Sequence, residues 1–233
     1  MKFVARFVFA PCLGAALSLA AAFAPIGARA DTEGKFAQLY AARPPAGSSF
    51  VRLVNPDSAR LSVKIADGPV QTLSGEATAS TYAIVKGNAP FTVSLNGKAV
   101  ATLTVAPDSF ATLVPRREGQ KVVFTVVDDG GGSQDALKAE LRFYNLAADC
   151  PNGRLAVAPA GPVLFSAVAP HAAAARPINP VSAKLAAACS TVASGALTLP
   201  ALQPGDHYSL FLVGTAGKPV LRGQVSATDP YGQ

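Results

Sequence analysis

Histidine, serine and acidic side chains are the groups that could support hydrolysis or acyl transfer in this chain. A serine or cysteine nucleophile needs a neighbouring base and a third group that orients the base. The 233 residues include only two histidines, His171 and His207. His171 lies in an alanine- and proline-rich stretch, and His207 follows Asp206 at the start of an expected strand, where adjacent side chains point to opposite faces. Because Asp206 cannot orient His207 and no G-x-S-x-G motif occurs, we predict that the protein is not an enzyme.

Three aspartates, Asp128, Asp129 and Asp135, flank a run of glycines and could suggest a calcium-binding loop. Their spacing lacks the ligand pattern of an EF-hand. The segment 128–135 contains no apolar residue, which is typical of a flexible, solvated linker. The sequence also lacks the glycine-rich motifs that bind nucleotides, so we expect neither a metal nor a cofactor.

The first 30 residues have the composition of a secretory signal peptide. Lys2 and Arg6 precede the apolar stretch 7–23, and Ala28-Arg29-Ala30 is an A-x-A cleavage site. A membrane anchor is the alternative, but Pro25 interrupts the apolar run. We therefore expect a protein that is exported by a cleavable signal peptide.

Removal of the signal peptide lowers the net charge. The whole chain has 20 basic and 14 acidic residues, and loss of Lys2, Arg6 and Arg29 leaves 17 basic against the same 14 acidic residues, a net charge of +3. This is a mild excess, and no basic cluster with interleaved aromatic residues occurs. These features exclude nucleic acid as a partner.

Two of the three cysteines, Cys150 and Cys189, lie beyond the signal peptide. An even pair in an exported protein is typical of a disulfide, because the compartment is oxidising. A metal site would need more ligands than two cysteines and two distant histidines supply. We predict a Cys150–Cys189 disulfide, which would stabilise the fold by about 3–4 kcal/mol.

From residue 49 onward the pattern is typical of short β-strands. Apolar and polar residues alternate at 61–65 and 91–95, as they do in half-buried strands. Asn96-Gly97 is a residue pair preferred in two-residue hairpin turns. Seven or so such strands, at hairpin spacing, predict an antiparallel sandwich over residues 49–127.

The second half of the chain repeats the first at an offset of about ninety residues. Arg52 aligns with Arg142, and Asn55 aligns with Asn145. The later correspondences keep the same order: 155–157 with 61–65, 180–185 with 90–95, 208–213 with 110–114, and 220–225 with the closing strand of the first half. A longer connection at 186–194 is expected in place of the Asn96-Gly97 hairpin.

This repeat predicts an all-β fold of two tandem antiparallel β-sandwich domains, Ig-like or jelly-roll-like, joined by a short Gly-rich linker. The expected organisation is a signal peptide at 1–30, a lead-in at 31–48 with a short helix at 35–42, a first sandwich at 49–127, a linker at 128–137 and a second sandwich at 138–233.

Strand alternation also assigns faces. Val51 and Leu53, with their equivalents ninety residues later, should point into the two cores. Arg52 and Arg142 then point out of the sandwiches, where an arginine can pair with a carboxylate or stack on a sugar or an aromatic ring of a partner. An ordinary solvated strand cation is the alternative.

The stretch from Leu39-Tyr40 through Pro45 to Phe50-Val51-Arg52-Leu53-Val54-Asn55 resembles the amino-terminal pattern of the AlgF family of periplasmic alginate O-acetylation proteins. That pattern is an L-Y dipeptide, a Pro/Gly spacer and an F-V-R-x-x-N strand. The resemblance extends to chain length, signal peptide and tandem β domains. Together with the repeat, it suggests these candidate partner-contact residues: Leu39, Tyr40, Arg52, Asn55 and Arg142.

The resemblance implies a non-catalytic periplasmic adaptor in the O-acetylation of an exopolysaccharide, either alginate or a similar polymer such as cellulose. The implied partners are a membrane-bound O-acyltransferase and a periplasmic acetyltransferase of the SGNH type, with the polysaccharide as a further candidate. A carbohydrate-binding sandwich that holds the polymer is the alternative. It would need an exposed aromatic platform, for which the candidates are Tyr40, Tyr82, Tyr144, Tyr208 and Tyr231, since the chain has no tryptophan. A third hypothesis is an enzyme that carries an acetyl group on a serine or histidine.

Overall fold

The computed structural model describes residues 44–75, 77–132, 135 and 137–231. All the secondary-structure elements within these ranges are β-strands, so the fold is all-β as predicted. The described part has no helix long and apolar enough to cross a membrane. The predicted signal peptide, the helix at 35–42, and Leu39 and Tyr40 lie outside the described residues.

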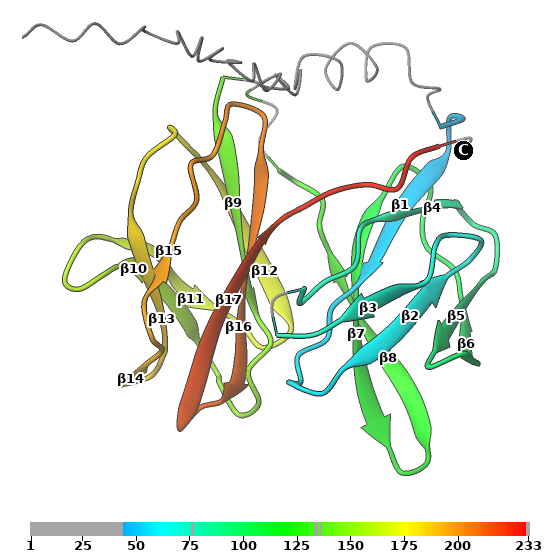
Figure 1. Cartoon of the computed structure of the whole chain (residues 1–233), viewed down its shortest axis with the longest axis horizontal. Coiled ribbons are helices and arrows are strands. Elements are labelled where there is room, and N and C mark those ends of the chain that lie inside the picture. The colour runs from blue at the N-terminus through cyan, green and yellow to red at the C-terminus, as the bar shows by residue number, and fades with distance from the viewer. Residues whose placement is uncertain (1–43, 76, 133–134, 136, 232–233) are drawn as a thin grey trace, which may run out of the picture. The chain divides into compact units, whose positions relative to one another are not determined.

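The first half forms two four-stranded sheets around one apolar core (Figure 1). Its strands are β1 (Ser48–Leu53), β2 (Leu61–Ile65), β3 (Gln71–Leu73), β4 (Ala83–Lys86), β5 (Phe91–Leu95), β6 (Lys98–Leu103), β7 (Phe110–Glu118) and β8 (Lys121–Asp128). The sheet orders are β4-β1-β7-β8 and β3-β2-β5-β6. Val51 and Leu53 of one sheet pack against Val63 and Val93 of the other, so the inward direction predicted for Val51 and Leu53 is confirmed.

The second half also forms two sheets around its own core. Its strands are β9 (Ala139–Asn145), β10 (Gly153–Val157), β11 (Val163–Val168), β12 (Ala172–Ile178), β13 (Lys184–Cys189), β14 (Val192–Ala193), β15 (Leu197–Thr198), β16 (His207–Thr215) and β17 (Lys218–Val225). The sheet orders are β12-β9-β16-β17 and β11-β10-β13-β14, with β15 also paired to β13. The predicted disulfide is confirmed: Cys150 and Cys189 are bonded and buried in this core, and their Cα atoms are 5.5 Å apart.

The two halves share one strand order, as the repeat predicts. In the first half β1 lies between β4 and β7, and in the second half β9 lies between β12 and β16. Both sheets contain one parallel pair, β1–β7 and β9–β16, among antiparallel neighbours. Arg52 lies opposite Thr112 in the first parallel pair, and Arg142 lies opposite Ser209 in the second. Arg52 and Arg142 therefore occupy equivalent positions.

Strands β11 and β12 lie in a stretch where the sequence carries no strand pattern. Residues 172–175 are four alanines, which have low β propensity. The neighbouring strand overrides this propensity, because β9 pairs with β12 along its whole length, from Ala172 opposite Asn145 to Ile178 opposite Ala139. Pro177 is tolerated because β12 is an edge strand.

The expected long connection at 186–194 is wrong in its first part. Strand β13 continues to Cys189, and the chain turns at Ser190, whose φ is 53°, into the short strand β14. The hairpin pairs Cys189 with Val192. The second half therefore keeps a hairpin where the first half has Asn96-Gly97.

The two halves pack together through the outer faces of the β1 and β9 sheets. A third apolar cluster there contains Val54, Ala79, Val114 and Val127 from the first half and Tyr144, Leu146, Phe211 and Val213 from the second. Tyr144 and Phe211 are the equivalents of Val54 and Val114 in the repeat. The same face of the same sheet is buried in both halves, as at the interface of a symmetric dimer.

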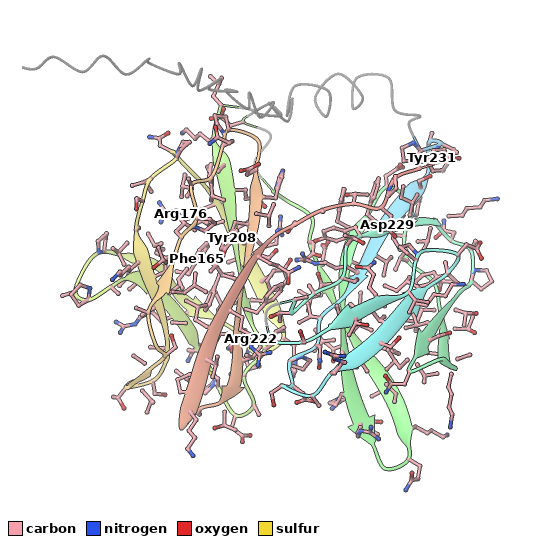
Figure 2. All side chains as sticks on the ribbon, viewed as in Figure 1. Phe165, Arg176, Tyr208, Arg222, Asp229 and Tyr231 are labelled. Atoms are coloured by element: carbon pink, nitrogen blue, oxygen red, sulfur yellow. A yellow bond between two sulfur atoms is a disulfide. The ribbon has the colours of Figure 1, made fainter. Side chains whose placement is uncertain are left out.

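The segment that follows β17 crosses to the first half; Figure 2 labels Asp229 and Tyr231 on it. We call residues 226–231 the C-terminal strap. The backbone N–H of Tyr82 donates to the carbonyl of Ala227, and the N–H of Asp229 donates to the carbonyl of Tyr82, both at 2.8 Å. Within β17, the Gln224 side chain donates to and accepts from the backbone of Ala79. The strap thus adds one bridge to the edge of the β4 sheet.

Candidate functional site

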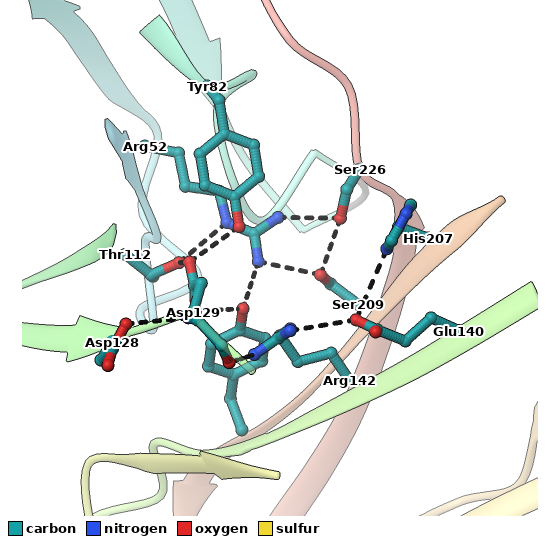
Figure 3. Close-up of polar contacts among 12 residues, drawn as sticks. Arg52, Tyr82, Thr112, Asp128, Asp129, Glu140, Arg142, His207, Ser209 and Ser226 are labelled. Atoms are coloured by element: carbon teal, nitrogen blue, oxygen red, sulfur yellow. Dashed lines mark hydrogen bonds and ion pairs between the residues drawn. The ribbon is translucent and has the colours of Figure 1, made fainter. Parts of the chain in front are cut away.

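The side chain of Arg52 lies at the centre of the contact between the halves (Figure 3). It points away from the core of its own sandwich, but the second half covers it and its exposed fraction is 0%. Its guanidinium donates to four hydroxyls: Thr112 at 2.9 Å, Tyr144 at 2.6 Å, Ser209 at 2.8 Å and Ser226 at 3.1 Å. The solvated alternative is therefore wrong for Arg52, and contact with a separate partner would require the halves to part.

Three aromatic rings surround the same guanidinium. Its central carbon lies 4.5 Å from the ring centroid of Tyr82, 5.3 Å from that of Tyr144 and 5.5 Å from that of Phe211. Burial opposes the charged form, but the electrostatic influence of Tyr144, Tyr82 and Asp129 outweighs it, so the pKa of Arg52 is raised above its ordinary value. Arg52 thus stays charged inside the protein, stabilised by ring faces and hydroxyl oxygens.

The counter-charge of Arg52 is Asp129, which follows β8. Asp129 is only 5% exposed and accepts hydrogen bonds from Tyr82 at 2.7 Å, from Tyr144 at 2.6 Å and from Thr112. Tyr144 and Thr112 each bond to both Arg52 and Asp129, so two hydroxyls bridge the charges. The prediction that 128–135 is a solvated linker is wrong at Asp129, because the second half encloses it.

The two bridging phenols are held in the neutral form. Burial raises the pKa of Tyr144 to about 12, although the nearby Arg52 charge lowers it in part. Burial also raises the pKa of Tyr82 well above its ordinary value, again against the influence of Arg52. Both hydroxyls therefore remain donors to Asp129 at neutral pH.

Arg142, the repeat equivalent of Arg52, has different partners. Its guanidinium donates to Glu140 at 3.1 Å and to the carbonyl of Gly130 at 3.3 Å. The Nδ1 atom of His207 lies 3.5 Å from the same Glu140 oxygen. Arg142 is mostly buried, so the solvated alternative does not describe it either.

Asp206 and His207 do not interact with each other in the described structure. Asp206 accepts a hydrogen bond from the backbone of Gln203 at 2.7 Å, while His207 points toward Glu140. His171 lies in an exposed turn with a φ of 54°. Among the described residues, neither histidine hydrogen-bonds to a serine hydroxyl.

A pocket of about 640 Å³ opens beside the Arg52 cluster, and we call it the junction pocket. Its first-half wall includes Tyr82, Asp108 and Phe110, and its second-half wall includes Lys138, Glu140, Arg142 and His207. Ser226, Ala227 and Thr228 of the C-terminal strap complete it. Both halves and the strap must therefore be in place for this pocket to exist.

Asn55 performs a local task. Its side chain donates to the carbonyl of Ala59 at 2.6 Å and accepts from the N–H of Asp57 at 3.2 Å, which holds the turn between β1 and β2. Asn145 is equivalent, and donates at 2.9 Å to the carbonyls of Cys150 and Val168. A role for Asn55 in partner contact stays a prediction.

The sequence does not single out Thr112, Ser209 or Phe110 as site residues, and it offers Asp129 only as a possible calcium ligand. Asp129 follows a strand and precedes a glycine run, which by itself is typical of a turn. Thr112 and Ser209 occupy outward positions beside the two arginines, and the repeat could have identified them as a polar pair. Phe110 carried no signal, because an aromatic at a strand start is common.

Comparisons with known proteins give one family. A model of the family described as "Alginate O-acetyl transferase AlgF" matches residues 15–209. The chain is 28% identical over 203 residues to the "Alginate biosynthesis protein AlgF" of Pseudomonas putida KT2440, with 87% of each chain covered. Among solved structures, a CBM26 module from Eubacterium rectale Amy13K in complex with maltoheptaose has a TM-score of 0.30 and 10% identity, covering 79% of this chain and 98% of the module. A similarity that low carries no argument.

Proposed function

The chain belongs to the AlgF family, and on that premise we propose that it is a non-catalytic periplasmic adaptor in the O-acetylation of an exopolysaccharide. The name of the curated relative supports alginate as the polymer, and a similar polymer such as cellulose is the alternative. The adaptor would link a membrane-bound O-acyltransferase to a periplasmic acetyltransferase of the SGNH type. It would reach the periplasm by means of the signal peptide expected at 1–30.

One observation carries the proposal: the charged groups between the halves bond to one another. Arg52 and Asp129 are bridged by hydroxyls, and Arg142 pairs with Glu140. Such groups stabilise one arrangement of the two sandwiches instead of acting on a substrate. An adaptor needs this property, because two binding surfaces must keep a constant spacing if they are to hold two partners.

The serines at the site support a non-catalytic role. Ser209 and Ser226 accept hydrogen bonds from the Arg52 guanidinium and lie 2.9 Å from each other. A serine nucleophile needs a base that removes its proton, and an arginine is a donor only. Both hydroxyls thus have an arginine as a partner, and an arginine cannot act as the base.

The test is a co-purification of the tagged protein with the membrane-bound O-acyltransferase and with the SGNH-type acetyltransferase, each co-expressed with it. We expect both to be retained, and a deletion strain should make polymer without acetyl groups. Normal acetylation of the polymer in the deletion strain would contradict the proposal. The intact mass of the protein after exposure to an acetyl donor distinguishes the adaptor from an enzyme that carries an acetyl group, since only the enzyme gains the mass of an acetyl adduct.

A further inference from the structure

Strand β8 lies at one end of the sheet β4-β1-β7-β8, and within that sheet it pairs only with β7. The N–H of Asp129 donates to the carbonyl of Phe110 on β7, and in an antiparallel ladder every second residue bonds to the same neighbour. The backbone groups of 123, 125 and 127 therefore face β7, whereas those of 122, 124 and 126 point away from it. No backbone group among the described residues bonds to this outward row.

Other outer edges of the described sheets carry features that prevent pairing with a further strand. Pro177 interrupts the row of donors on β12, and Pro219 does so on β17. Register shifts disturb the pairing of β6 and β11, and the side chain of Arg176 bonds to the backbone of β11. The C-terminal strap bridges to the β4 edge, and β3 and β14 have only three and two residues.

Strand β8 has a different composition from these edges. It is eight residues long, and between Lys121 and Asp128 it contains only valine, phenylalanine and threonine. These residues have high β propensity, and neither a proline nor a charge interrupts them. The pairing with β7 is regular along the whole strand. A long, uncharged edge of this kind is a template for another strand.

The repeat shows that one apolar side chain at this edge lacks the cover that its equivalent position has. Phe124 packs partly against the core of the first half, whereas Val126, on the same side of β8, is 51% exposed. The equivalent of Val126 in the second half is Gly223, where the ring of Tyr208 leaves no room for a side chain. Ala111 stands in the place of Tyr208 in the first half, so no ring covers Val126.

The turn between β7 and β8 is basic, and it extends past the rest of the first half (Figure 1). Arg116, Arg117, Glu118 and Lys121 are all exposed there. Arg116 pairs with Glu118 at 2.8 Å, and no carboxylate of the described residues forms an ion pair with Arg117 or Lys121. The turn therefore has a net charge of +2, which favours an acidic partner.

The unpaired backbone groups indicate what kind of segment fits this edge. N–H and C=O groups at strand spacing are complemented by another extended strand, as in β-strand addition. A second copy of β8 would bring one exposed carboxylate, Asp128, and a single strand pair is small beside the roughly 1,200–2,000 Å² that stable interfaces bury. A different protein can add an acidic surface that contacts the basic turn.

We propose that β8 binds an extended strand of a partner protein. Its apolar side chains, at alternate positions, would cover Val126, and its acidic residues would lie beside Arg117 and Lys121. The sheet would then grow from four strands to five. This inference rests on the proposed function, because the strand would belong to one of the two acetylation partners that the adaptor links.

The experiment is a co-purification of the full chain with each of the two acetylation partners, using Val126→Lys. A charge at this exposed position blocks strand addition and leaves the bonds to β7 in place. We expect one partner to bind about tenfold or more weakly and the other to be retained. Val163→Lys is the matched control, since Val163 is 46% exposed on the edge strand β11, and it should retain both partners.

The basic turn is tested by charge reversal. Lys121→Glu should weaken binding of the same partner about fivefold, because it removes an attraction and adds a repulsion. Lys218→Glu is the control, since Lys218 is the exposed repeat equivalent of Lys121 on β17. Hydrogen exchange of the complex gives a second readout: the amides of 122, 124 and 126 should exchange more slowly with the partner bound.

The outcomes separate this inference from the proposed function. If the parent protein retains both partners and Val126→Lys does too, or if exchange at 122, 124 and 126 is unchanged in the complex, the inference is wrong and the adaptor stands. If the parent retains neither partner, both proposals are wrong. Sedimentation velocity tests the remaining occupant: a dimer of the parent that Val126→Lys dissociates would assign the β8 edge to a second copy and overturn the inference.

Discussion

Arg52 is a fully buried cation, and its surroundings explain why the protein tolerates it. Removing a guanidinium from water is costly unless hydrogen bonds and a counter-charge replace the water. Four hydroxyl acceptors, three ring faces and the carboxylate of Asp129 take that place here. Since those groups come from both halves and the strap, this one side chain depends on the whole arrangement.

Replacement of Arg52 should therefore destabilise the protein. We expect Arg52→Ala to lower the free energy of unfolding by about 3–5 kcal/mol, because Asp129 is left buried without its counter-charge. The measurement is urea denaturation followed by circular dichroism. Arg116→Ala is the matched control, since its side chain is 59% exposed and pairs with Glu118, whose side chain is 55% exposed. A loss below about 1 kcal/mol, as for a surface arginine, would mean that Arg52 is not buried in solution.

The raised pKa of Tyr144 should make the folded protein less stable at alkaline pH. Its pKa is raised from 10 in the unfolded chain to about 12 in the folded protein. The stabilisation is fully present below about pH 10, and it is lost as the pH rises from about 10 toward about 12, because the unfolded chain releases the proton first. The size is on the order of 3 kcal/mol. Denaturation midpoints over this pH range measure it.

The variant Tyr144→Phe tests the assignment. It should be less stable than the parent at neutral pH, because bonds to Arg52 and Asp129 are lost, but its stability should fall less steeply in alkali. Tyr231→Phe, at an exposed tyrosine, should leave the pH profile unchanged. Equal slopes for the parent and Tyr144→Phe would assign the alkaline loss to other groups, of which Tyr82 is the first.

At the scale of elements, the β1 and β9 strands organise their halves in the same way. Each lies between an antiparallel and a parallel neighbour and directs alternate side chains into its own core and toward the other half. The remaining elements diverged more. The second half replaces the long β6 with the short β14 and β15, and it adds the disulfide between the loop after β9 and the end of β13.

The disulfide should matter for the second half alone. We expect the pair Cys150→Ala and Cys189→Ala to lower the free energy of unfolding by about 3–4 kcal/mol, since the bond closes a loop with a sequence separation of 39. Hydrogen exchange should accelerate in β10 and β13 before it does in β2 and β5. Reduction of the parent protein is the control and should reproduce the effect. Equal acceleration in both halves would contradict this local role.

At the scale of the molecule, the two sandwiches share a hydrophobic interface and a polar centre. The outer faces of the β1 and β9 sheets carry Val54, Val114, Tyr144 and Phe211, which would be exposed in separate domains. Burial of such residues couples the halves, so we expect each half to stabilise the other. The C-terminal strap adds to this coupling through its bonds to Tyr82 and to Arg52.

Truncation after Val225 tests the strap. Loss of the bonds from Ser226, Ala227 and Asp229 should lower the free energy of unfolding by about 2–4 kcal/mol. A chain that ends at Asp229 keeps these bonds and is the matched control. Unchanged stability would show that the strap does not bind the first half in solution.

The sequence by itself determined the features that depend on local pattern. Alternation of apolar and polar residues located β2 and β5, and the period of a strand assigned Val51 and Leu53 to the core. The cysteine pair identified the disulfide, and the offset of the repeat aligned Arg52 with Arg142. The strand predictions succeed because the two-residue period of a strand is visible in neighbouring residues. The disulfide prediction succeeds because two cysteines in an exported chain can pair only with each other. The alanines of β12 were not predicted to form a strand, because only their pairing with β9 makes them extended.

The tertiary structure alone decided what covers the outer faces. A polar residue that points away from its own core has the same sequence pattern whether water, a partner or a second sheet lies beyond it. A sheet of the second half covers Arg52. Asp129 lies in the segment predicted to be a linker, but it is buried in the contact between the two halves. The junction pocket likewise exists only where distant segments meet, so neither its lining nor the exposed ring of Phe110 could be predicted from residues 108–110 or 138–142 taken alone.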